Sequence, residues 1–272
     1  MKNQKNTKPQ FSELHKKFIR KNRVQTTLTH LIRALLLILL LGVWELATAT
    51  GAIDPFIASS PSRVAKTFVS LLRESNLLHH SWVTLSETLL AFAISTIIGL
   101  LVAIVLYMIP FMRRVLEPYL VVLNSLPKIA LGPLIIVWMG TGTKTIVAMG
   151  VLICVVITAI NMLNAFCGVE KDKIMLMKTM GANNLQTFTR LVFPSNIPAL
   201  ISCLKINVGM AWVGVIMGEY LTSKAGLGYL IVYGGQVFKL DLVMTSIVVL
   251  CVLAGLMYGL IALIEMYVNK KR

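Results

Sequence analysis

The chain has 272 residues, of which 57% are hydrophobic and 14% are charged, and its mean hydropathy is +0.79. Ordinary soluble domains carry roughly 25% charged residues, so the composition excludes a typical soluble domain and favours an all-α polytopic membrane protein. The net charge of +15 does not indicate nucleic-acid binding. The basic residues stand at the ends of apolar runs and do not form one face or stripe.

A basic tail, residues 1–30, precedes the first apolar run at 31–49. A run of about 20 apolar residues is long enough to cross a bilayer. This run ends in an Ala-Thr-Ala triplet that resembles a signal-peptidase site, but the long basic region before it favours a retained anchor. Residues 50–83 then form a polar loop, in which we expect a short amphipathic helix over 62–72 at the outer surface.

Further apolar runs predict five more spans, at 88–109, 115–139, 145–166, 199–218 and 242–264. Six spans put both termini on one side of the membrane. Of the 26 Lys and Arg residues, 18 fall on that side, counting Arg33 at the start of the first run with the tail, and six fall on the other. Because basic residues are enriched in cytoplasmic loops, both termini are expected in the cytoplasm. The transmembrane domain is then 84–266, followed by a basic tail at 267–272.

The third run contains residues that a lipid-facing helix avoids. It includes Asn124, Pro127, Lys128 and a Gly-Pro pair at 132–133, and proline removes a backbone donor and clashes with the preceding turn. We therefore expect this span to be kinked or broken. A lysine near the membrane centre costs about 2.5–3.5 kcal/mol on insertion scales, so Lys128 is expected to line a translocation path, with snorkelling as the alternative.

Two polar residues at predicted span ends, Asn161 and Glu219, complete the candidate pathway, although residues at such positions commonly serve as interfacial anchors. Two G-x-x-x-G pairs, at 214/218 and 255/259, favour close helix packing. The four cysteines and four histidines lack metal-ligand spacing, and we expect no cofactor. Residues 140–145 resemble a phosphate loop without its spacing, so any ATP hydrolysis belongs to a separate subunit.

The longest internal cytoplasmic segment, 168–198, is predicted to form two short helices hinged at Gly181. Gly181 can end the first helix, Asn183 or Asn184 can cap the second, and Pro194 closes the segment. One face of the second helix is apolar and consists of Leu185, Phe188, Leu191 and Val192. Such a face is expected to fill a groove, although a helix resting on the membrane surface is the alternative.

The same segment carries a resemblance to a known family. Gly181-Ala182 followed by Leu191, Phe193 and Pro194 resembles the cytoplasmic signature of binding-protein-dependent ABC importer permeases, in which Glu-Ala-Ala precedes the glycine. Here Met175, Leu176 and Met177 stand at those three places. The patterns Ser60-Pro61-Ser62, Leu126-Pro127, Ala211-Trp212 and Gly226-Leu227-Gly228 place the resemblance nearest to the nitrate, sulfonate and taurine branch.

The resemblance implies a type I importer permease in the inner membrane, with a second permease copy in a homodimer, a cytoplasmic ATP-binding subunit and an extracytoplasmic solute-binding protein. It implies that the segment couples to the ATPase, and the residues expected to do so are Met175, Leu176, Met177, Gly181, Ala182, Leu185, Phe188, Leu191 and Pro194. Lys128 and Lys205 suit a small anionic solute. The alternatives are a pyrimidine thiamine precursor as solute, an ion-gradient-driven carrier and a membrane enzyme.

Overall fold

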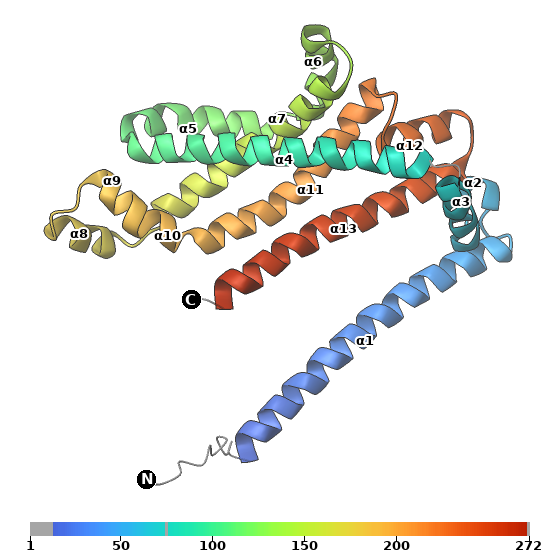
Figure 1. The fold of residues 1–272 in the computed structure, drawn as a ribbon, viewed down its shortest axis with the longest axis horizontal. Coiled ribbons are helices and arrows are strands. Elements are labelled where there is room, and N and C mark those ends of the chain that lie inside the picture. Colours follow the sequence, from blue (N-terminus) through green and yellow to red (C-terminus); the bar gives the residue numbers. More distant parts are fainter. Residues whose placement is uncertain (1–12, 74–75, 271–272) are drawn as a thin grey trace, which may run out of the picture. The chain divides into compact units, whose positions relative to one another are not determined.

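A computed structural model describes residues 13–73 and 76–270, and every secondary-structure element in them is a helix. The chain divides into two compact units, one ending at Arg63 and the other beginning at Val64. Figure 1 shows the helices and the labels used below.

The first unit contains α1 (Glu13–Ala49) and the single turn α2 (Pro55–Ala58). The part of α1 from Thr27 to Ala49 is long and apolar enough to cross a membrane, and its large apolar side chains are exposed around the helix. Such a surface suits lipid. The Glu45 carboxylate accepts hydrogen bonds from the backbone N–H and the hydroxyl of Ser62, at 3.0 and 2.6 Å, and so ties the end of α1 to the last residues of the first unit.

The amphipathic helix expected after the first span is confirmed as α3 (Pro61–Arg73). Its apolar side packs within the second unit, where Leu71 and Leu72 lie against a cluster of Leu77, Leu227 and Leu230. The helix therefore covers the ends of the long spans with its apolar side.

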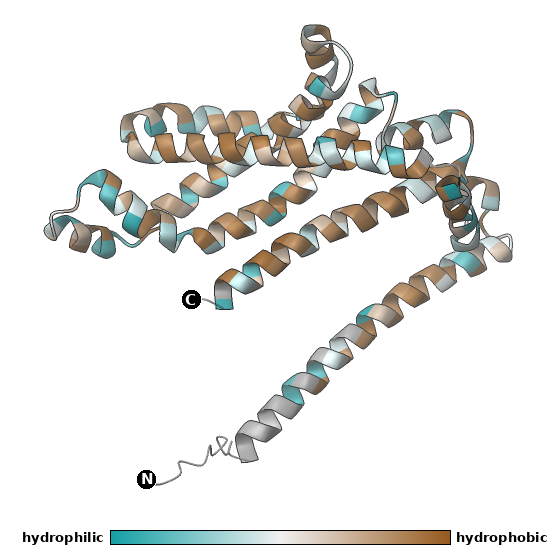
Figure 2. Cartoon of the chain, viewed as in Figure 1, coloured by the Kyte–Doolittle hydropathy of each residue, from teal (hydrophilic) through white to brown (hydrophobic). Residues whose placement is uncertain are grey.

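Four long helices form the second unit: α4 (Asn76–Met108), α7 (Thr143–Cys167), α11 (Ile197–Thr222) and α13 (Leu240–Lys270). Each contains a stretch that is long and apolar enough to span a membrane, and Figure 2 shows hydrophobic residues along most of their lengths. The most extensive packing joins α4 to α7 and α7 to α11. The shorter α12 (Leu227–Gln236) packs against α13.

The start of the second span is a correction to the sequence prediction. We expected it at residue 88, but α4 begins at Asn76. The polar residues His80 and Thr84 lie before the apolar run, and both accept hydrogen bonds from the backbone of a distant turn, at Gly226 and Leu227. Their polar atoms are satisfied within the fold, so the helix can include them.

The predicted break in the third run is confirmed. α5 (Pro110–Ser125) ends before Pro127, and η1 (Lys128–Leu131) with α6 (Gly132–Met139) continues at an angle of 87° to it. If this bent pair is one span, the described residues contain six candidate spans.

The two G-x-x-x-G pairs behave differently. A Cβ atom on Gly214 would lie 2.6 Å from Cα of Gly150, and one on Gly218 would lie 2.8 Å from Cα of Ile146. This pair therefore lets α11 approach α7 closely, as predicted. A Cβ atom on Gly255 or Gly259 would meet no heavy atom of another element within 4 Å, so this pair makes no close helix contact in the described residues.

Candidate functional site

The 168–198 segment consists of α8 (Lys171–Thr179), a turn, and the nearly continuous helical stretch α9 (Asn184–Thr187), η2 (Phe188–Val192) and α10 (Phe193–Ser195). The prediction of two helices hinged at Gly181 is confirmed. Gly181 has φ +82°, and the N–H groups of Gly181 and Ala182 donate to the carbonyls of Lys178 and Met177, at 2.9 and 3.0 Å. This pair of hydrogen bonds is the Schellman ending of a helix, which favours glycine at the left-handed position.

Asn183 caps the second helix, as one of the two predicted candidates. The Gln186 N–H donates to Asn183 Oδ1 at 2.7 Å, and the Asn183 N–H donates to Gln186 Oε1 at 2.9 Å. These reciprocal bonds form a capping box, which satisfies two otherwise free backbone donors. The hinge and the cap together fix where α8 ends and where α9 begins.

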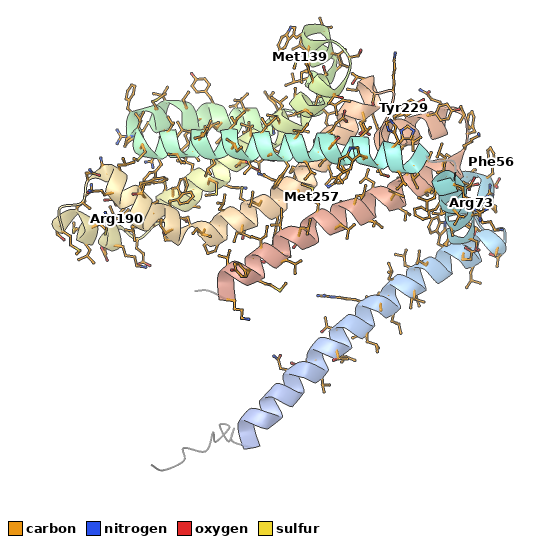
Figure 3. All side chains as sticks on the ribbon, viewed as in Figure 1. Phe56, Arg73, Met139, Arg190, Tyr229 and Met257 are labelled. Atoms are coloured by element: carbon orange, nitrogen blue, oxygen red, sulfur yellow. The ribbon has the colours of Figure 1, made fainter. Side chains whose placement is uncertain are left out.

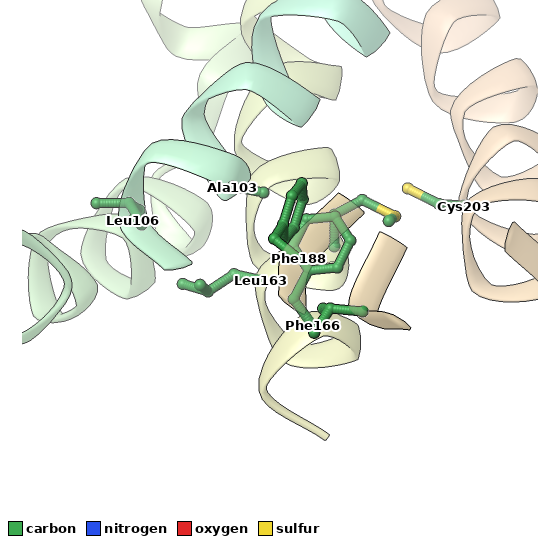
Figure 4. Close-up of a cluster of buried hydrophobic side chains, with 8 residues drawn as sticks. Ala103, Leu106, Leu163, Phe166, Phe188 and Cys203 are labelled. Atoms are coloured by element: carbon green, nitrogen blue, oxygen red, sulfur yellow. The ribbon is translucent and has the colours of Figure 1, made fainter. Parts of the chain in front are cut away.

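The second helix is anchored in the bundle by its buried aromatic side. Phe188 and Val192 belong to a buried cluster with Leu106 of α4 and Leu163 and Phe166 of α7, and Figure 4 shows Phe188 beside Phe166. The ring of Phe193 lies 6.0 Å from that of Phe188. Aromatic pairs at such distances add to the gain from burial.

A separate set of apolar side chains on the segment is exposed. Met175, Leu176, Met180 and Leu185 are 61–76% exposed. The other candidate coupling residues Met177, Ala182, Leu191 and Pro194 are half-buried. The expected single apolar face is thus divided: Leu185 points outward, whereas Phe188 and Val192 fill this chain's own core.

Lys128 lies at the break in the third span. Its ammonium group donates to the backbone carbonyl of Asn124 at 3.2 Å. That carbonyl is in the last turn of α5, where free carbonyl groups favour a positive charge. Asn124 and Pro127 are exposed and Lys128 is half-buried, so the break keeps the lysine accessible while one of its hydrogen bonds is satisfied.

The remaining candidate pathway residues do not converge on Lys128. Asn161 is roughly 9 Å along α7 from the end that leads into the 168–198 segment, and Glu219 is roughly 33 Å along α11 from that segment. They lie toward opposite ends of the bundle. No hydrogen bond or ion pair joins Lys128, Asn161 and Glu219 in the described residues, and their role in a pathway stays a prediction.

Two polar contacts inside the bundle were missed by the sequence analysis. The Asn207 amide of α11 donates to the hydroxyls of Thr158 on α7, at 2.7 Å, and Thr96 on α4, at 3.2 Å. Lys205 of α11 forms an ion pair with Glu265 of α13 and lies 5.7 Å from the ring centroid of Tyr258. A lysine within one apolar run and a glutamate directly after another were the available signal for the ion pair.

Long apolar helices, one broken span and a polar segment anchored on the bundle are the architecture of a polytopic membrane protein. Residues 95–272 match the binding-protein-dependent transport system inner membrane component family, and the chain belongs to that family. It is therefore a multi-pass protein of the inner membrane. Among the alternatives raised by the sequence, the family match supports a subunit of an ABC importer and not an ion-gradient-driven carrier or a membrane enzyme.

Curated relatives and a solved structure agree with this assignment. The chain is 29% identical over 195 residues to the formylaminopyrimidine transport permease ThiX of Halalkalibacterium halodurans, covering 72% of this chain and 77% of ThiX. It is 24% identical over 226 residues to the taurine transport permease TauC of Escherichia coli, and the match covers 81% of this chain and 82% of TauC. The inward-facing MetNI methionine ABC transporter shares the fold, with a TM-score of 0.64 and 21% identity over 72% of this chain and 97% of the MetNI chain.

Proposed function

We propose that the exposed apolar residues of the 168–198 segment receive the ATP-binding subunit of the importer. The chain is an ABC importer permease, and its family works in binding-protein-dependent transport. The observation that carries the proposal is the division of the segment: Phe188 anchors it in the bundle, whereas Met175, Leu176 and Leu185 are exposed.

Burial of these side chains in a groove of the partner supplies the binding energy. Complete burial of a Leu or Met side chain contributes about 1.5–3 kcal/mol, and methionine adapts to irregular surfaces. Met175, Leu176 and Met177 replace the Glu-Ala-Ala of the family signature, so apolar insertion takes the place of a salt bridge from the acidic residue. The anchored helix then transmits the movement of the ATPase to α4 and α7.

The surrounding assembly is part of the same proposal. Two permease copies enclose the pathway, the termini and the 168–198 segment face the cytoplasm, and an extracytoplasmic binding protein delivers the solute. The uneven distribution of Lys and Arg supports this orientation. Closure of the two ATPase subunits draws the two segments together and opens the cavity outward, and ATP hydrolysis returns it to the inward-facing state.

The docking surface is tested by affinity purification in mild detergent. Leu185→Asp is expected to reduce recovery of a phosphate-loop ATPase with the permease at least tenfold, while membrane insertion and thermal stability remain unchanged. The volume-conserving Leu185→Met and the control Thr189→Asp, at an exposed position on the same segment, should retain the partner. Full ATPase recovery with both Leu185→Asp and Leu176→Asp would refute the docking surface.

The transported solute is proposed to be a small anion of the sulfonate, nitrate or taurine type. Of the two lysines inside the predicted spans, Lys205 is neutralised by Glu265. Lys128 has no carboxylate within ion-pairing distance in the described residues and lies at the break. Similarity to TauC, a taurine transport permease, supports this class. A pyrimidine precursor is the second candidate, supported by the similarity to ThiX.

Uptake of taurine, nitrate and a formylaminopyrimidine by cells carrying the complete importer separates the two classes. For an anionic solute, Lys128→Gln should reduce uptake strongly while ATPase recovery is unchanged, and Lys144→Gln, an exposed lysine at the start of α7, should have little effect. Uptake of the pyrimidine alone, unaffected by Lys128→Gln, would establish the second candidate.

A further inference from the structure

Two carboxyl groups from different spans meet inside the bundle. Glu87 of α4 is 2% exposed and Glu219 of α11 is 1% exposed. The two side chains lie within hydrogen-bonding reach of each other. Each has one buried oxygen, Oε2 of Glu87 and Oε1 of Glu219, that receives no hydrogen bond. A buried oxygen of this kind is costly unless a donor reaches it.

The turn between α11 and α12 holds the Glu219 carboxyl in place. Its Oε2 accepts a hydrogen bond from the Gly228 N–H at 2.6 Å. A Cβ atom on Gly226 would lie 2.4 Å from its Oε1, and one on Gly228 would lie 2.7 Å from its Oε2. The carboxyl group therefore occupies the space that two glycines leave open, and it cannot turn away from Glu87 without disturbing this turn.

The described side chains that pack against the pair supply no positive charge. On α4, His80 Nδ1 accepts the Gly226 N–H at 2.9 Å, so this nitrogen carries no proton and the imidazole is neutral. On α12, Tyr229 stacks on His80 with ring centroids 5.9 Å apart, and Figure 3 labels Tyr229 on this helix.

The other neighbours are neutral as well. The Thr143 side chain at the start of α7 lies near Glu87, the Thr84 side chain of α4 lies near Glu219, and Tyr220 follows Glu219 on α11. In the described part of the chain, no Lys or Arg forms an ion pair with either carboxyl. The pair therefore has no cationic partner there to balance two negative charges.

We propose that Glu87 and Glu219 form a buried site that binds one proton between them, and that this proton joins α4 to the turn between α11 and α12. Two carboxylates in contact cannot both ionise without a large repulsion. When one carboxyl group holds the shared proton, it becomes a hydrogen-bond donor and the other carboxylate accepts. A hydrogen bond to a charged oxygen is stronger than one between neutral groups. The Gly228 N–H, which donates to Oε2 of Glu219, stabilises the single remaining charge. The proton belongs to the pair as a whole.

The sign of the pH dependence follows from this arrangement. In the unfolded chain both carboxyls are exposed and lose their protons well below neutral pH. The folded chain therefore holds one proton more than the unfolded chain near neutral pH, and lowering the pH stabilises it. Raising the pH until the pair loses its proton places two charges in contact and weakens the turn that Glu219 holds.

Infrared spectroscopy of the purified full chain tests the site directly. Solvent-exposed carboxyl groups are ionised at about pH 7, so a carbonyl stretch of a protonated carboxylic acid at that pH reports a buried proton. We expect one such group per chain, and we expect its loss in both Glu87→Gln and Glu219→Gln. The control Glu117→Gln removes an exposed glutamate of α5 and should keep the signal. A wild-type spectrum without this band would overturn the proposal, and this result requires no variant to fold.

Thermal unfolding in detergent gives a second readout that is independent of transport. The melting temperature of the wild type should rise between about pH 8 and about pH 6. The melting temperature of Glu87→Gln should rise less over the same pH interval, because the glutamine amide donates the same hydrogen bond without titrating. A melting temperature that instead depends on Na⁺ or K⁺ at constant ionic strength, and loses this dependence in the Gln variants, would show a bound cation and overturn the proton site. Failure of the docking or solute proposals leaves both results unchanged.

Discussion

The ring of Phe188 lies edge-on to the ring of Phe166, with 5.2 Å between the centroids and 84° between the planes. Phe188 belongs to the 168–198 segment and Phe166 to the last turn of α7. The contact joins the proposed ATPase-docking segment directly to a span that packs on both α4 and α11. Movement of the segment must therefore displace α7 or break this aromatic contact.

Replacing Phe188 should separate the structural role of the segment from its docking role. Phe188→Ala removes a buried ring from the core, which costs about 3–5 kcal/mol, so the melting temperature should fall and the ATPase should dissociate. Leu185→Ala removes an exposed side chain and should weaken ATPase recovery without lowering the melting temperature. Equal loss of stability in the two variants would contradict the division of the segment into an anchored and an exposed side.

The hinge at Gly181 can be tested by its backbone conformation alone. Gly181→Val places a β-branched residue at φ +82°, where a non-glycine residue costs about 1–2 kcal/mol. Gly181→Asn should be milder, since asparagine tolerates this region. We expect ATPase recovery to decrease in the order Gly, Asn, Val. Proteolysis within the segment should become faster in the same order, from Gly to Asn to Val. Equal ATPase recovery and equal proteolysis in all three proteins would show that the hinge tolerates other conformations.

Gly214 and Gly255 make a matched pair for helix packing. Gly214→Val forces a side chain against the backbone of Gly150 on α7. Because overpacking of this kind costs about 1–3 kcal/mol or more, the melting temperature should fall. Gly255→Val meets open space in this chain and should leave the melting temperature unchanged. A fall with Gly255→Val would instead reveal a surface that packs against a second permease copy.

The ion pair between Lys205 and Glu265 predicts a rescue. Lys205→Ala leaves the carboxylate of Glu265 without its partner and should lower the melting temperature, as should Glu265→Ala. The exchanged pair, Lys205→Glu with Glu265→Lys, restores the attraction and should recover much of the loss. A double-mutant cycle measures the coupling between the two residues. Additive effects in this cycle would show that the pair does not join α11 to α13.

The Lys205 variants also test the solute proposal. If Lys205 contacted an anionic solute, the exchanged pair would lose uptake while it regained stability. We expect uptake and stability to recover together, because the lysine is already paired within the chain. Measurement of both quantities in the same variants distinguishes a structural from a solute-binding lysine.

Local features of the fold were predictable because each depends on a short stretch of sequence. Apolar runs located the spans, since lipid requires about 20 consecutive apolar residues. Pro127 indicated the break in the third span, and Gly181 with Asn183 indicated the hinge and the cap, because these residues favour such backbone conformations directly. The signature around Gly181 and Pro194 also indicated the family.

Other features depended on partners far away in the chain. The apolar run placed the start of the second span at residue 88, and only the tertiary structure supplies the backbone donors of the turn between α11 and α12 that bond His80 and Thr84. Glu87 was expected near a span end, but the earlier start of α4 places it inside the helix, next to Glu219. No local pattern shows whether a buried polar group will find its partner.

The sequence by itself determined the class of protein, the number and position of most spans and the break near Lys128, because hydropathy and backbone preference act over short distances. The tertiary structure decided how chemically similar residues are used. Leu185 and Phe188 share an apolar pattern, yet one is exposed and the other buried. Gly214 and Gly255 share a spacing, yet one meets a helix and the other meets open space. Each outcome depends on which surfaces come into contact, and only the packed helices specify that.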